Sequence, residues 1–154
     1  MSRQSSSVHP QGGDRVLALD AGTTALSSEV HANRLLTLSD LDDPYTLNLP
    51  RAFGTGDVYE FLSTGARTSG SIIINAVGTA PSNRFVGTIW QRTSASTLVQ
   101  FSSTVNDIIT LNITTTGGAG VGDYLKIQDT APAQWRVIFG LFTTSGAQAT
   151  PFSG

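Results

Sequence analysis

The chain has 154 residues, a formal net charge of −2 and a charged fraction of only 13%. This length predicts one domain with a sizeable core, and so few basic residues exclude a dedicated phosphate-binding face, so we expect no nucleic-acid partner. The absence of cysteine excludes a disulfide scaffold, a thiolate zinc site and a cysteine nucleophile. No window reaches the roughly 18 apolar residues of a membrane span, so we expect no membrane partner.

The N-terminal residues are polar. Residues 1–14 contain three consecutive serines, two adjacent glycines and a proline, and they bury too little apolar surface to offset their ordering entropy. The run that follows, Arg15–Leu19, has enough apolar content to pair with a neighbouring chain. We therefore predict a flexible N-terminal arm, residues 1–22, and a body, residues 23–154. We assign partner binding to four residues of the arm: Arg15, Val16, Leu17 and Leu19.

Short apolar runs separated by Gly, Pro, Asn, Asp and Ser fill the body, a pattern typical of many short strands. Strands are predicted at 72–74, 85–90 and 98–101, where the pattern does not define which side chains face the core. The pattern predicts an all-β fold with about nine strands, a single antiparallel β-sandwich or barrel that is jelly-roll-like. Five runs alternate most clearly and are expected to turn these residues to the core: Tyr45, Leu47 and Leu49; Tyr59 and Phe61; Ile109, Leu111 and Ile113; Leu125 and Ile127; Trp135, Val137 and Phe139.

One stretch departs from this pattern. Residues 23–43 contain neither glycine nor proline, and apolar residues recur there at near-helical spacing. A helix over the whole stretch would include the β-favouring run Leu35–Leu38. We therefore predict a short helical turn at Ser28–Ala32, with Ser27 or Ser28 as its cap, followed by a strand at Arg34–Ser39.

No set of residues predicts catalysis. His31 could serve a Ser-His-Asp triad, but no Gly-x-Ser-x-Gly motif is present, and we interpret His31 as a structural residue near a turn. The acidic cluster Asp40, Asp42 and Asp43 could ligate calcium, but it lacks the glycine and the distal glutamate of a helix-loop-helix calcium loop. A turn before Pro44 explains it equally well, and we prefer the turn. We expect no enzyme activity, no metal and no cofactor.

Two further patterns have a structural and a functional interpretation. The glycine-rich run 116–123 is similar to a phosphate-binding loop, but a strand follows it instead of the helix that such a loop needs, so we interpret it as a strand connection. A group of aromatic residues could form a sugar-binding platform, although we expect core positions for most aromatics in a strand-rich domain. This group comprises Phe53, Tyr59, Phe61, Trp90, Trp135 and Phe139.

Several short motifs follow one another along the chain. In the first half these are the segments 29–34 (EVHANR), 45–50 (YTLNLP) and 54–61 (GTGDVYEF). A His and Arg pair thus precedes a strand, and a Leu-Pro-x-x-x-Gly-x-Gly segment leads into a strand with an aromatic residue. The second half agrees in the segments 106–112, 116–118, 122–124, 135–137 and 149–153. In this order the motifs resemble the head decoration (cement) proteins of tailed bacteriophages. The resemblance covers residues 23–153, and Arg51 and Phe53 stand where small residues are expected.

The resemblance implies a structural virion protein that binds the outer surface of the assembled phage head and stabilises it against internal pressure. It implies the major capsid protein as partner, a homotrimer over threefold points, assembly in the bacterial host cytoplasm and no enzyme activity. The alternative is a phage fibre or receptor-binding domain that recognises a host surface glycan through exposed aromatics. The arm favours decoration, because it offers extended main chain for pairing with a capsid strand.

Overall fold

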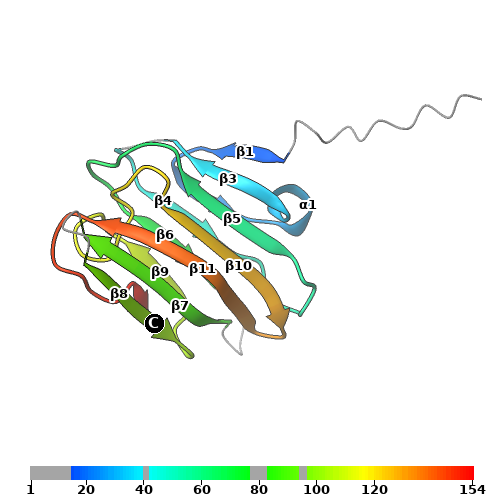
Figure 1. Ribbon diagram of the computed structural model, residues 1–154. Coiled ribbons are helices and arrows are strands. Elements are labelled where there is room, and N and C mark those ends of the chain that lie inside the picture. Colours follow the sequence, from blue (N-terminus) through cyan, green and yellow to red (C-terminus); the bar gives the residue numbers. More distant parts are fainter. Residues whose placement is uncertain (1–14, 40–41, 77–82, 94–96) are drawn as a thin grey trace, which may run out of the picture.

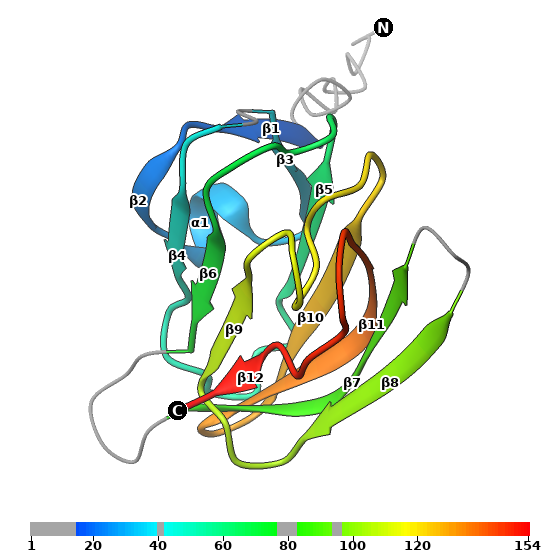
Figure 2. The same cartoon turned by 90° about the vertical axis from the view of Figure 1, so that its left-hand side faces the viewer.

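A computed structural model of the protein describes residues 15–39, 42–76, 83–93 and 97–154. Twelve strands and one four-residue helix make up this part of the chain, which confirms the all-β prediction. Figure 2 shows two sheets that lie face to face, with the short helix at one end between them. The predicted arm residues 1–14 lie outside the described residues.

The first sheet has seven strands, and Figure 1 looks onto its outer face. Neighbouring strands follow the order β1 (Val16–Leu19), β3 (Arg34–Leu38), β5 (Val58–Ser63), β10 (Tyr124–Ala131), β11 (Gln134–Thr144), β7 (Arg84–Thr93) and β8 (Leu98–Ser103). The second sheet has five strands, in the order β12 (Phe152–Ser153), β9 (Ile108–Leu111), β6 (Ile72–Asn75), β4 (Tyr45–Asn48) and β2 (Gly22–Ala25).

The prediction of antiparallel sheets is wrong, because both sheets are mixed. In the N-terminal half the chain winds through three coils, and each coil gives one strand to each sheet. Consequently β1, β3 and β5 are parallel neighbours, as are β2, β4 and β6, and β7 also pairs parallel with β11. Apolar residues alternate with period two in either direction of pairing, so alternation could not distinguish the two. The strand count of nine was also too low, since the short strands β2 and β12 were not predicted.

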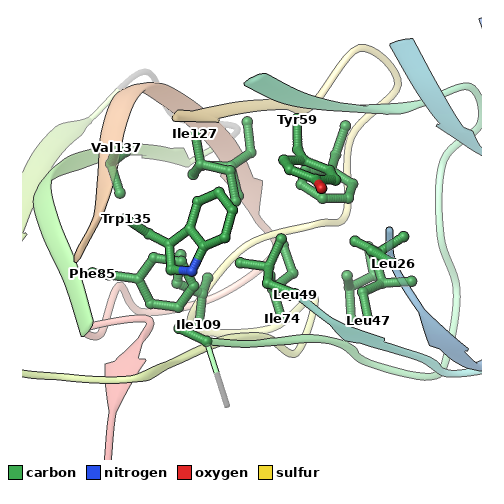
Figure 3. Packing of buried hydrophobic residues seen from close by; sticks show 14 of the residues in the cluster. Leu26, Leu47, Leu49, Tyr59, Ile74, Phe85, Ile109, Ile127, Trp135 and Val137 are labelled. Atoms are coloured by element: carbon green, nitrogen blue, oxygen red, sulfur yellow. The ribbon is translucent and has the colours of Figure 1, made fainter. Parts of the chain in front are cut away.

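Side chains from both sheets form one core. The predicted inward residues of β4, β5 and β10 are all buried, and the indole of Trp135 lies at the centre, where Figure 3 shows it beside Phe85, Ile109 and Ile127. The ring of Trp135 meets that of Tyr59 edge to face, with the ring centroids 5.5 Å apart. Trp135 is the largest fully buried side chain and Tyr59 is among the next largest, so truncating either should remove much of the core packing.

Two predicted core positions are wrong. Phe139 is 45% exposed, because β11 carries one extra residue relative to its neighbours β10 and β7. Such a β-bulge shifts the alternation, so that Ile138 and Phe139 both face outward. Ile113 lies beyond the end of β9 with a positive φ of 58°, and it takes no part in the strand alternation.

Candidate functional site

The helical prediction is confirmed, and it gives His31 a structural role. Helix α1 spans Ser28–His31, and Ser27 caps it by accepting a hydrogen bond from the amide of Val30. The Ser27 amide donates to Nδ1 of His31 at 3.0 Å, which closes the same turn from the other side. Burial lowers the pKa of His31, which favours the neutral imidazole, the form that can accept this hydrogen bond at Nδ1. The ring therefore fixes the turn that leads into β3.

The glycine-rich run connects β9 to β10 and is organised by one buried carboxylate. Oδ2 of Asp123 accepts hydrogen bonds from the amides of Gly118 (3.1 Å), Gly120 (3.1 Å) and Thr143 (2.9 Å). A strand follows the run, as predicted, so it is a strand connection. Because these amides donate to Asp123, they are engaged within the chain and do not offer a phosphate site.

We expect ionisation of Asp123 to lower the stability of the protein, relative to a variant without this carboxyl, as pH rises. Burial raises the pKa of this carboxyl, while hydrogen bonds from Thr143 and Gly120 and the charge of Arg92 oppose the rise. The folded state therefore keeps this proton to a higher pH than the unfolded chain does. The stability that the group contributes is complete below the unfolded pKa and is lost as pH rises through the folded pKa.

The measurement is urea unfolding of wild type and Asp123→Asn from about pH 3 to about pH 7. Wild type should lose stability relative to the variant as pH rises. The other carboxyl groups titrate in both proteins, so the difference in stability between wild type and the Asn variant isolates the effect of Asp123. A difference that is constant with pH, or that grows in favour of wild type, would contradict the prediction.

Asp42 and Asp43, the described residues of the acidic cluster, are tied to the β5–β6 connection. Asp40 lies outside the described residues. The hydroxyl of Thr68 donates to the Asp42 carboxylate, and Oγ of Ser69 donates to the carbonyl oxygen of Asp42 at 2.8 Å. The guanidinium of Arg67 donates to the carbonyl oxygen of Asp43 at 2.7 Å. Within the described ranges, no three His, Cys, Asp or Glu side chains gather closely enough to hold a metal ion.

The aromatic residues do not form one platform. Tyr59, Phe61 and Trp135 are core residues. Phe53 is 62% exposed in the loop before β5, whereas Phe139 and half-buried Trp90 lie on the outer face of the seven-stranded sheet. The structure therefore separates the proposed group into a buried set and two exposed places.

The residues assigned to partner binding lie in and beside strand β1. Leu19 is 6% exposed and Leu17 packs against the core, so these two side chains stabilise this chain itself. Arg15 is exposed, and Val16 is 56% exposed on the outer face. The predicted boundary at residue 22 therefore falls inside the folded body, because β1 pairs with β3 over its whole length.

Strands β1 and β2 end their sheets on the same side of the molecule, and we call this side the β1–β2 end (Figure 2). The Leu35 amide donates to the Arg15 carbonyl oxygen at 2.7 Å. Successive residues of a strand direct their main-chain groups to opposite edges. Within the described residues, the amides and carbonyls of Val16 and Ala18 consequently point to the open edge of β1.

Deleting residues 1–19 should lower the free energy of unfolding by about 3 kcal/mol, because it removes the buried Leu19 side chain and the β1–β3 hydrogen bonds. The hydroxyl of Tyr45, which donates to the Leu19 carbonyl oxygen at 3.3 Å, would also lose its partner. Deletion of residues 1–14 is the control, since it leaves β1 in place. Equal urea midpoints for the two deletions would show that β1 does not stabilise the body.

The outer face of the seven-stranded sheet is the second candidate surface. Figure 1 shows no described element in front of it. The register places Trp90 beside Leu141, and Leu141 beside Tyr124, on the same side of adjacent strands. Alternation along β7 places Arg84 and Arg92 on this side too, and both are exposed. The residue pattern of 85–90 does not define which side chains face outward, so this surface was not predicted from sequence.

No described helix is long and apolar enough to cross a membrane. Comparison with protein-family models, with curated proteins and with solved structures finds no significant match to the chain.

Proposed function

We propose that the protein is a decoration protein of a tailed phage, which binds the outer surface of the head, stabilises the shell and catalyses no reaction. The ordered resemblance over residues 23–153 supports this function. Its partners are the major capsid protein and further copies of the chain in a homotrimer. It joins the virion in the cytoplasm of the bacterial host. Its body is a single β-sandwich in which two mixed sheets share one core.

The observation that carries the proposal is the β1–β2 end. Strand β1 has the sequence VLAL and β2 has GTTA, so neither edge strand contains a charged residue or a proline. Monomeric β proteins usually protect such edges with these residues, with a bulge or by keeping the edge strand very short, because an open edge pairs with other chains. At four residues each, β1 and β2 have only their short length as protection. An edge without charge, proline or bulge is expected of a subunit that assembles. Pairing with a neighbouring chain satisfies the outward groups of Val16 and Ala18.

Electron microscopy of the phage that encodes the chain tests the location. Copies distributed over the head shell support decoration. Copies found only at the tail tip contradict it and favour the fibre or receptor-binding alternative. Mass photometry of the isolated protein tests the assembly, because a closed ring of three copies covers the β1 edge in each of them. A strict monomer, both in solution and on the head, contradicts the trimer.

Ala18→Pro tests whether the β1 edge makes the contact. Proline removes an amide that points away from β3, so the variant keeps the β1–β3 hydrogen bonds and folds. We expect it to lose the trimer, whereas Ala18→Ser, which retains the amide, keeps it. A proline variant that is folded and still trimeric contradicts pairing through this edge.

A further inference from the structure

The outer face of the seven-stranded sheet carries positive charge on a negatively charged chain. Its basic residues are exposed Arg84, Arg92 and Arg136 together with Lys126, and its one acidic residue among those described is Glu60. Elsewhere in the described chain there are four basic and eight acidic residues. Among the described residues, positive charge therefore predominates on the outer face of this sheet and negative charge predominates elsewhere.

Contacts within the face neutralise only one of these basic groups. Nζ of Lys126 lies 3.1 Å from Oε1 of Glu60, and the hydroxyl of Tyr124 donates to Oε2 of the same carboxylate at 2.6 Å. The Nε–H of Arg92 donates to the Thr143 hydroxyl at 3.1 Å, which holds the side chain without cancelling its charge. The Lys126–Glu60 contact is the one ion pair among the described residues of this face. The arginines thus leave the face with a net positive charge.

Apolar side chains lie among the arginines. Leu98 is 55% and Phe139 is 45% exposed. Half-buried Trp90 and Leu141 lie beside each other on neighbouring strands. The cores of protein interfaces are enriched in aromatic residues and arginine and depleted in lysine and acidic residues. The outer face has this composition over β7, β8 and β11.

We propose that this face docks onto an acidic protein surface, and, resting on the proposed function, that this surface belongs to the phage head shell. A second copy placed face to face would bring arginines opposite arginines, and such like charges repel. Nucleic acid fits less well, because the face combines few cations with large apolar side chains, whereas phosphate backbones are bound mainly through many basic contacts. An acidic partner surface complements the arginines and covers Trp90 and Phe139.

The test is co-sedimentation with undecorated heads from the encoding phage. Arg136→Glu should weaken binding by about tenfold, and the double variant Arg84→Glu/Arg136→Glu should weaken it further. Arg51→Glu is the matched control: it makes the same charge change at an exposed residue outside the sheet and should stay within about twofold of wild type. Urea unfolding of each variant establishes that it is folded.

Salt provides a second readout. Raising ionic strength from about 50 to about 300 mM should weaken wild-type binding more than binding of the double variant, because screened charge attraction is lost. Equal binding of the folded double variant and Arg51→Glu overturns the docking face but not the proposed function. A wild-type chain that does not bind heads contradicts the proposed function and also the assignment of this face as the docking surface. Duplex DNA could also compete with heads for wild type and fail to bind the double variant. That result would assign the face to nucleic acid and overturn the docking proposal.

Discussion

Trp135→Ala should lower the free energy of unfolding by about 4 kcal/mol, the largest loss expected from a single core truncation in this protein. The side chain is 1% exposed and its ring meets Tyr59 at a centroid distance of 5.5 Å, so alanine removes packing from both sheets and leaves a cavity. Urea unfolding followed by circular dichroism measures the change.

Two variants make this result interpretable. Trp135→Phe should cost only about 1 kcal/mol, because it keeps most of the buried ring and removes an indole N–H that has no hydrogen-bond partner within the described residues. Trp90→Ala, on the outer face, should cost about 1 kcal/mol or less. Equal losses for Trp135→Ala and Trp90→Ala would contradict the assignment of Trp135 to the centre of the core.

Gly117→Ala should be destabilising by a similar amount, about 4 kcal/mol, from backbone strain and overpacking together. Gly117 has a φ of +112°, and a Cβ at this position would lie 2.4 Å from Cβ of the buried Phe142. A Cβ so close to another Cβ cannot be relieved by a rotamer change alone, so the loop or β11 must move.

Gly22→Ala separates the two causes. Gly22 has nearly the same φ, +106°, but its Cβ would meet nothing within 4 Å. Its loss should therefore reflect strain alone, about 1 kcal/mol. If both variants lose the same stability, the contact with Phe142 contributes nothing and the packing of this loop is not as described.

Local features were predictable from sequence, whereas strand direction was not. Ser27 and the run after Arg34 were sufficient to predict the helical turn and β3, and alternation at Tyr45, Leu47 and Leu125 identified core positions. Parallel coiling was not predictable, since a strand's side chains alternate in the same way whichever neighbour it joins.

The outward turn of Phe139 and the docking face were missed for related reasons. The bulge in β11 depends on pairing with β10 and β7, which a single segment does not encode. A signal for the face was present, however: Arg84, Trp90 and Arg92 are separated by even numbers of residues, so a strand through 84–92 places all three on one side. Arg136 completes this face, but it lies beside these β7 residues only once β7 and β11 are paired.

Strands β10 and β11 occupy the middle of the seven-stranded sheet, but they are synthesised after all its other members. After β5 is complete, about 60 further residues must be synthesised before β10 can pair with the edge of β5 that lies opposite β3. Until then, the three N-terminal coils expose the main chain of β5, and β7 lacks its parallel neighbour. Long-range pairings of this kind form slowly, and a nascent strand with an open edge is prone to aggregation. Translation rate and chaperone supply should therefore limit the soluble yield more than the stability of the finished fold does.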